Sequence, residues 1–144
     1  MTDQQIEREI FISAAPERVW PLVAEPGFWA TDDESIRGTQ ATQGQEFVAR
    51  HSQHGEFPMR VEKADAPHFL AVRWNSAFPG EELLDETSTL VEFTLTPESG
   101  GTRLRVVETG FAGLRTTDDN RRNVIKDHTG GWEACLTTLA GRAA

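Results

Sequence analysis

Residues 118–139 read DDNRRNVIKDHTGGWEACLTTL and decide the fold of this 144-residue chain. A mostly apolar set of positions in this stretch recurs at steps of three and four residues, the period of one helix face. The set comprises Val124, His128, Trp132, Cys135 and Leu139. The stretch therefore predicts a C-terminal helix of roughly 22 residues and about 33 Å, with Asp118 or Asp119 as its N-cap.

The residues before this helix alternate in hydrophobicity, as half-buried strands do. Strands are predicted over residues 6–12, 45–53, 56–64, 69–76, 88–96 and 102–109. After the first strand, Ser13 near the cap and Pro16 in the first turn favour a short helix that ends before Pro26-Gly27. Phe28-Trp29 predicts a turn or a second short helix. The polar residues 31–44 predict a loop.

This order of elements predicts an α+β fold. About six strands in hairpin connection form an antiparallel sheet, and only the last helix is long enough to cover one of its faces. The sequence contains no repeat and no linker-like segment. We expect a single domain over residues 1–144.

The composition argues against several classes of partner and location. A net charge of −9 does not suit nucleic acid or an anionic membrane surface, because both require a basic footprint. No apolar run approaches the roughly 20 residues that span a bilayer, and the polar start MTDQQ is unlike a signal peptide. One cysteine, Cys135, fits a reducing compartment. We expect a cytoplasmic protein.

Strand alternation assigns the face of the sheet that lies under the helix. The apolar residues of that face are predicted to be Phe47, Ala49, Phe57, Met59, Val61, Leu70, Val72, Trp74, Val91, Phe93, Leu95, Leu104 and Val106. Arg8 and Glu108 share the phase of this face, where a charge is costly unless it is paired or hydrated. Both residues could reach water at strand ends, anchor polar groups in a cavity, or meet if the first and last strands are neighbours.

Four motifs in order resemble the START-like superfamily, also called SRPBCC or Bet v-like. Residues 10–20, IFISAAPERVW, are similar to its opening strand followed by A-x-P-x-x-V-W. Residues 61–74, VEKADAPHFLAVRW, resemble the V-x-x-x-x-P-x-x-L-x-x-x-W segment of the branch related to the activator of heat-shock protein 90 ATPase. Residues 102–108, TRLRVVE, precede 128–136, HTGGWEACL, which is similar to the closing H-x-x-G-W-x-x-x-L.

The resemblance implies a helix-grip fold, in which a curved antiparallel sheet wraps the C-terminal helix and leaves a cavity. Members of the superfamily bind lipids, sterols, polyketides or other apolar molecules, and some are cyclases. Our first hypothesis is therefore a non-enzymatic binder of a small apolar or aromatic molecule. The residues predicted to bind it are Arg8, Phe28, Trp29, Met59, Trp74, Phe78, Phe93, Glu108, His128 and Trp132.

Two alternatives use other properties of the same chain. The first is a polyketide cyclase-like enzyme, in which His128 or Glu108 serves as acid or base on an enolisable substrate. The second is a protein-interaction module, for instance a chaperone partner in the stress response, that uses the acidic loop of residues 81–86, EELLDE.

Other reactive residue types do not form a convincing site. His51, His54 and Glu56 invite a zinc interpretation, but they fall on a predicted hairpin and no second cluster completes a set of four ligands. Cys135 lies among apolar helix residues without an evident base, which indicates an inert buried thiol. We expect no metal, no cofactor and no catalytic residue of the hydrolase type.

Overall fold

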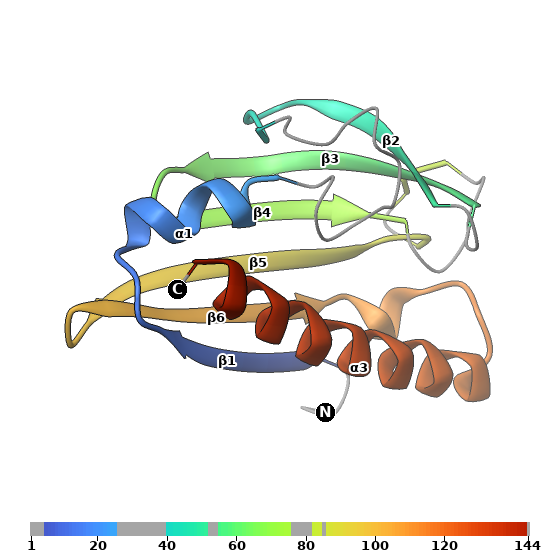
Figure 1. Ribbon diagram of the computed structural model, residues 1–144. Helices are drawn as coiled ribbons and strands as arrows, with labels where there is room; N and C mark the ends of the chain where they lie inside the picture. Colours follow the sequence, from blue (N-terminus) through green and yellow to red (C-terminus); the bar gives the residue numbers. More distant parts are fainter. Residues whose placement is uncertain (1–4, 26–39, 52–54, 76–81, 85, 144) are drawn as a thin grey trace.

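The computed structural model describes residues 5–25, 40–51, 55–75, 82–84 and 86–143. Six strands form an antiparallel sheet in the spatial order β1-β6-β5-β4-β3-β2 (Figure 1). The strands are β1 (Ile6–Ile12), β2 (Glu46–His51), β3 (Gly55–Asp65), β4 (Phe69–Trp74), β5 (Thr89–Glu98) and β6 (Gly101–Thr109). The predicted antiparallel sheet is confirmed, and its first and last strands are neighbours.

The helices lie on one face of this sheet (Figure 1). They are α1 (Pro16–Val23), the 3-10 helix η3 (Phe111–Gly113) and the long α3 (Asp118–Ala143). The α+β helix-grip fold predicted from the resemblance is therefore confirmed. The segment Phe28-Trp29, for which a turn or a second short helix was predicted, lies outside the described residues.

The inner face of the sheet carries the core, as the alternation predicted. Its fully buried members are Met59, Val61, Leu70, Val72, Val91, Phe93, Leu95, Leu104 and Val106. Phe47 is half-buried, and the side chains of Ala49 and Phe57 are not described. Burial of each large apolar side chain stabilises the fold by about 1.5–3 kcal/mol before chain entropy is counted.

The β5–β6 hairpin has a two-residue turn. Glu98 pairs with Gly101, and the turn residues Ser99 and Gly100 have φ angles of 48° and 79°. Two consecutive positive φ angles are typical of a type I′ turn, whose twist suits a tight hairpin. Gly101 itself is needed for close approach, because a Cβ atom there would lie 2.3 Å from the carbonyl oxygen of Ile12.

Helix α1 begins at Pro16, as predicted, and packs Val19 and Val23 into the core. Its N-cap residue is Ala15, which has no capping side chain. The expectation that Ser13 acts near the cap is therefore wrong: a proline at the first helical position already removes one of the unpaired N–H groups that a cap would satisfy.

Helix α3 buries Trp132, Leu136, Leu139 and Ala143 against the sheet and α1. Its N-cap is Thr117, whose Oγ1 accepts a hydrogen bond from the N–H of Asn120 at 3.1 Å. Asp118 and Asp119 instead occupy the first turn, where their negative charges interact favourably with the positive end of the helix dipole. The prediction that one of them is the cap was thus wrong by one residue.

Gly130 and Gly131 lie on the exposed side of α3. A Cβ atom at either position would meet no atom within 4 Å. The glycine pair therefore does not serve a close approach of α3 to the sheet.

A buried guanidinium holds the connection between β6 and α3. Arg121 donates hydrogen bonds to the carbonyl oxygens of Phe111 at 2.8 Å, Leu114 at 2.9 Å and Thr116 at 3.2 Å. Its side chain is 14% exposed and also pairs with Asp118. These bonds satisfy carbonyl groups of an irregular segment and fix where α3 starts.

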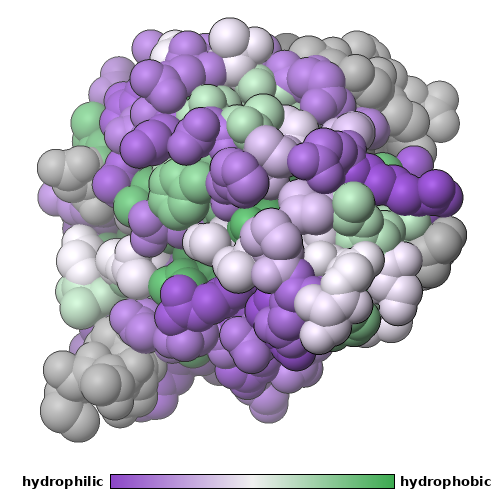
Figure 2. Space-filling view, turned by 90° about the vertical axis from the view of Figure 1, so that its left-hand side faces the viewer, coloured by the Kyte–Doolittle hydropathy of each residue, from purple (hydrophilic) through white to green (hydrophobic). Residues whose placement is uncertain are grey.

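One face of the molecule is mostly polar. On the face shown in Figure 2, hydrophilic residues predominate and hydrophobic ones form small patches among them. No helix in the described parts of the chain is both long and apolar enough to cross a membrane.

Candidate functional site

A carboxylate lies inside the apolar core. Glu108, on β6, has no solvent-exposed surface, although the residues around it are largely hydrophobic. A charge in such a place is stable only if donors surround it. The structure supplies four of these, from β4, β5 and α3.

The four donors divide between the two carboxylate oxygens. Oε2 accepts hydrogen bonds from Trp74 Nε1 at 2.9 Å and Thr89 Oγ1 at 2.5 Å. Oε1 accepts one from Trp132 Nε1 at 2.8 Å. His128 Nδ1 lies 2.9 Å from both oxygens. We call these five residues the Glu108 cluster.

Strand register and helix period explain why these side chains meet. Trp74 on β4 is paired with Thr89 on β5, and Glu108 is paired with Val91, two residues farther along β5. Residues two apart on a strand share a face, so all three side chains point to the helix. His128 and Trp132 are four residues apart on α3 and therefore lie on one side of it.

The pKa of Glu108 lies below its ordinary value of 4.5. Burial acts to raise it, but the charge of a protonated His128 and the hydrogen bonds from His128, Thr89 and Trp132 outweigh burial. The carboxyl group is therefore ionised at neutral pH. An ionised carboxylate only accepts hydrogen bonds, so Nδ1 of His128 carries the donated proton.

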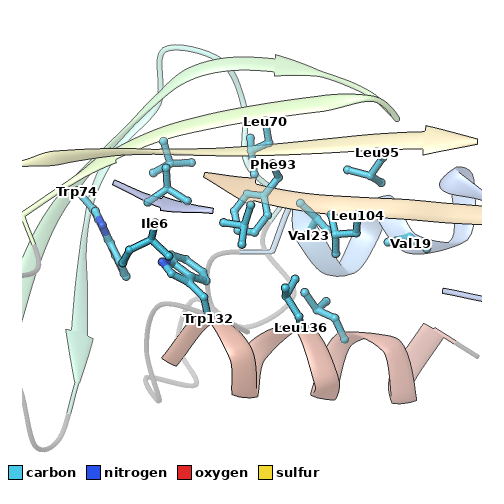
Figure 3. Close-up of a cluster of buried hydrophobic side chains, with 14 of the residues drawn as sticks. Ile6, Val19, Val23, Leu70, Trp74, Phe93, Leu95, Leu104, Trp132 and Leu136 are labelled. Carbon is cyan, nitrogen blue, oxygen red and sulfur yellow. The ribbon is translucent and has the colours of Figure 1, made fainter. Parts of the chain in front are cut away.

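Aromatic rings enclose the cluster. The Trp74 and Trp132 rings have centroids 5.6 Å apart, and Phe93 meets Trp132 edge-on at the same distance. Figure 3 shows Trp132 pointing from α3 toward the sheet, with Trp74 and Phe93 on the opposite side. The His128 ring packs against Trp74 and Phe111 at 5.6 and 5.8 Å.

The structure brings together most of the described residues predicted to bind a ligand. Trp74, Glu108, His128 and Trp132 belong to the cluster. Phe93 contacts Trp132, and Met59 lies opposite Trp74 in the β3–β4 register. Phe28, Trp29 and Phe78, which were also predicted to bind the ligand, lie outside the described residues.

Arg8 lies away from this group. Its side chain is 43% exposed and forms an ion pair with Glu133 of α3 at 3.0 Å. The strand phase was read correctly, but β1 is at the edge of the sheet, so a long side chain on its inner face reaches water and the helix surface. Although β1 and β6 are neighbours, Arg8 pairs with Glu133 rather than with Glu108.

Thr89 was not singled out from the sequence. Its hydroxyl makes the shortest of the hydrogen bonds to Glu108, and the residue is 3% exposed. The available signal was its place at the start of a strand in phase with Val91 and Phe93. A threonine at that position is typical of any strand. Only the strand register shows that it lies beside a carboxylate.

The other candidates gain no chemistry from the structure. Among the described residues, no group of three or more His, Cys, Asp or Glu side chains could hold a metal ion. His54 is outside those residues. Burial raises the pKa of the Cys135 thiol to about 12. The thiol is therefore protonated at neutral pH and a poor nucleophile.

The acidic loop is anchored through its backbone. Thr87 donates a hydrogen bond to the carbonyl oxygen of Glu82 at 2.7 Å, and Ser88 donates to that of Leu84 at 2.5 Å. The buried Asn75 side chain also donates to Glu82. Leu84 is 43% exposed. Protein binding by this loop stays a prediction.

Comparisons with known proteins agree on the fold. The family model described as Activator of Hsp90 ATPase homolog 1-like protein matches residues 13–144. A search of curated proteins gave no significant match.

Several solved structures are similar to this chain over nearly its whole length. Protein MLL2253 from Mesorhizobium loti has a TM-score of 0.72 and 21% identity, covering 95% of this chain and 94% of its own. The Aha1 dimer from Colwellia psychrerythraea has a TM-score of 0.69 and 18% identity, with 94% and 92% covered. DynU16, from the dynemicin biosynthetic locus, has a TM-score of 0.69 and 18% identity, with 95% and 46% covered.

Proposed function

Because the chain belongs to the family of activator of Hsp90 ATPase homolog 1-like proteins, we propose that it binds a small hydrophobic or aromatic molecule between its sheet and α3. The observation that carries the proposal is the Glu108 cluster. Small-molecule sites are mostly apolar and contain a few converging polar groups that fix orientation. The cluster has this character: one ionised carboxylate and one imidazole within walls of tryptophan and phenylalanine.

The position of α3 supports a site on one side of the cluster. The backbone of α3 approaches the sheet closely at β1, and it also meets α1. In Figure 1, α3 lies over the β1 and β6 side of the sheet and not over β3 and β2. The large rings of Trp132 on α3 and Trp74 on β4 lie side by side at this boundary. A flat molecule that enters from the β3 side would stack on these rings.

Within the cluster, His128 is the member placed to meet a ligand. Its side chain is 16% exposed, whereas Glu108 is fully buried and bonded on both oxygens. In this proposal Glu108 holds the two indole N–H groups and the imidazole in place, and His128 orients the polar end of the ligand.

Tryptophan fluorescence tests this proposal directly. The wild-type protein would be titrated with 1-naphthol, a flat flavonoid and palmitic acid, together with the variants Trp132→Phe and Trp20→Phe. We expect saturable quenching with at least one probe, weakened in Trp132→Phe and retained in Trp20→Phe, because Trp20 lies on α1 outside the cluster. Unsaturable quenching with every probe, or equal quenching in both variants, would contradict it.

One observation favours a second candidate, proton transfer to a bound ligand. A carboxylate that contacts Nδ1 holds an imidazole in one orientation and one tautomer, in which Nε2 is the nitrogen that can act as a general base. Of the two residues considered for a cyclase-like enzyme, the geometry favours His128, because four donors already occupy Glu108. Exchange of the α-protons of 1-tetralone, followed by NMR, tests this candidate. Exchange accelerated by the wild-type protein and lost in His128→Gln supports it, and equal rates contradict it.

A further inference from the structure

The two halves of α3 are held in the fold to different degrees. After the pair Gly130-Gly131, the helix buries Trp132, Leu136, Leu139 and Ala143. Figure 3 shows Trp132 and Leu136 pointing from this half toward the sheet. The described residues 118–129, which form the first half, include none that is fully buried. The first half therefore gains less stability from apolar burial than the second.

A run of weak helix formers lies at the boundary between the halves. Residues 127–131 read DHTGG, and none of these residue types favours a helix, glycine least of the four. The Thr129 hydroxyl also donates a hydrogen bond to the carbonyl oxygen of Ile125 at 2.7 Å, a bond that slightly destabilises helices. The helix is therefore intrinsically weak at this point.

Packing gives no reason for the glycine pair. A Cβ atom at Gly130 or Gly131 would meet no atom within 4 Å, and neither residue has a positive φ angle. Alanine would thus fit at both positions, and each substitution would favour the closed helix roughly fivefold. The effect of the pair is to lower the cost of opening the helix.

The pair separates two members of the Glu108 cluster. His128 lies just before it and Trp132 directly after it. His128 Nδ1 lies 2.9 Å from both oxygens of Glu108, a contact that local unwinding at the pair would break. Trp132 is anchored in the core and would stay there.

The start of the helix is anchored as well. Arg121 donates hydrogen bonds to carbonyl oxygens of the connection from β6, and this connection buries Phe111 and Leu114. The first half of α3 is therefore not a free arm that could swing away. An opening is confined to the turns between Arg121 and Trp132.

We propose that α3 opens locally at Gly130-Gly131, between the anchors Arg121 and Trp132, and that this opening takes His128 away from Glu108. One part of the inference rests on the proposed function: the open form admits the ligand to the rings of Trp74 and Trp132, and the closed form retains it.

Amide hydrogen exchange, followed by NMR without any ligand, tests the opening. In a helix the N–H of residue i bonds to the carbonyl oxygen of residue i−4, so the amides of residues 132–134 report on residues 128–130. In the wild-type protein they should exchange at least about tenfold faster than the amides of Leu136 and Leu139. Gly130→Ala and Gly131→Ala should each raise their protection factors roughly fivefold, and the double variant roughly 25-fold.

Gly141→Ala is the matched control. Gly141 also has open space around its Cβ position, but it lies two residues before α3 ends at Ala143. This substitution should leave the protection of residues 132–134 unchanged. If these amides are as protected as those of Leu136 and Leu139 in the wild-type protein, or if Gly141→Ala protects them equally, they exchange through global unfolding and the proposal is overturned.

Stopped-flow mixing with 1-naphthol tests the role of the opening in ligand entry. The double variant Gly130→Ala/Gly131→Ala should bind and release 1-naphthol roughly 25-fold more slowly at unchanged affinity, because the closed helix is formed in the free and the bound protein alike. Rates equal to those of Gly141→Ala would overturn this role. Absence of binding by every probe would contradict the proposed function, and the exchange result would still decide on the opening.

Discussion

Trp132 Nε1 on the C-terminal helix and Glu108 Oε1 on the last strand lie 2.8 Å apart in the interior of the protein. This bond joins the two layers of the fold at a charged atom. Because Trp74 donates to the other oxygen of the same carboxylate, a single residue orients two indole rings.

Glu108→Ala should lower the free energy of unfolding by about 3–5 kcal/mol, because it leaves the donors of the cluster buried without their acceptor. Glu108→Gln keeps the shape but turns an amide N–H toward a donor, and it should cost about 1–3 kcal/mol. Urea denaturation measures both. Glu9→Gln, at an exposed position of β1, is the control and should change little. Equal stabilities of the three variants would show that the buried carboxylate is dispensable.

The stability of the protein should depend on the ionisation of Glu108. Its pKa is lower in the folded protein than the ordinary 4.5, so the unfolded chain binds the proton more readily. The stabilisation is fully present above pH 4.5 and is lost as the pH falls through the lower folded pKa. Below pH 4.5 the free energy of unfolding should therefore fall more steeply in the wild-type protein than in Glu108→Gln. Parallel curves for the two proteins would contradict this assignment.

Neighbouring arginines on α3 should differ sharply in their effect. Arg121 donates to three carbonyl oxygens and is largely buried, whereas Arg122 is 67% exposed and pairs with Asp119 one turn away. Arg121→Ala should destabilise by about 1–3 kcal/mol, because buried carbonyl groups lose their partner. Arg122→Ala should cost at most about 0.5 kcal/mol. Thermal unfolding of the two variants makes the comparison, and similar losses would contradict it.

Cys135 should be unreactive in the native protein. Its pKa of about 12 leaves almost no thiolate at pH 8, and thiolate is the form that attacks disulfide reagents. Labelling with 5,5′-dithiobis(2-nitrobenzoate) should be slow in buffer and fast in denaturing urea. Rapid labelling of the folded protein would show that the thiol is accessible and activated.

The sequence predicted the strands, their inner face and the long helix because each depends on a local period. Glu108 was recognised as an unusual charge on the inner face for the same reason. Its partners were harder to predict. The pairing of Trp74 with Thr89 depends on register, which turns and bulges set, and β3 contains an irregularity between Val61 and Lys63.

Two other expectations were wrong because they depend on more than local sequence. One depends on the position of a strand in the sheet, and the other on which of several neighbouring residues caps a helix. The phase of Arg8 was read correctly, but the phase does not reveal that β1 is an edge strand, from which a long side chain reaches solvent. In the sequence TTDD of residues 116–119, four residues of two types compatible with capping stand together, and the structure uses Thr117. Propensity ranks such residues too closely to choose among them.

The most direct test of the account is a titration of the ¹⁵N-labelled protein followed through the indole Nε1–H resonances. If a small apolar molecule binds between the sheet and α3, the signals of Trp74 and Trp132 should move together and saturate with 1-naphthol or a flavonoid. The signal of Trp20 should stay in place. If the Trp74 and Trp132 signals do not move with any probe that the protein binds, the ligand does not lie beside the Glu108 cluster, and the central claim is wrong.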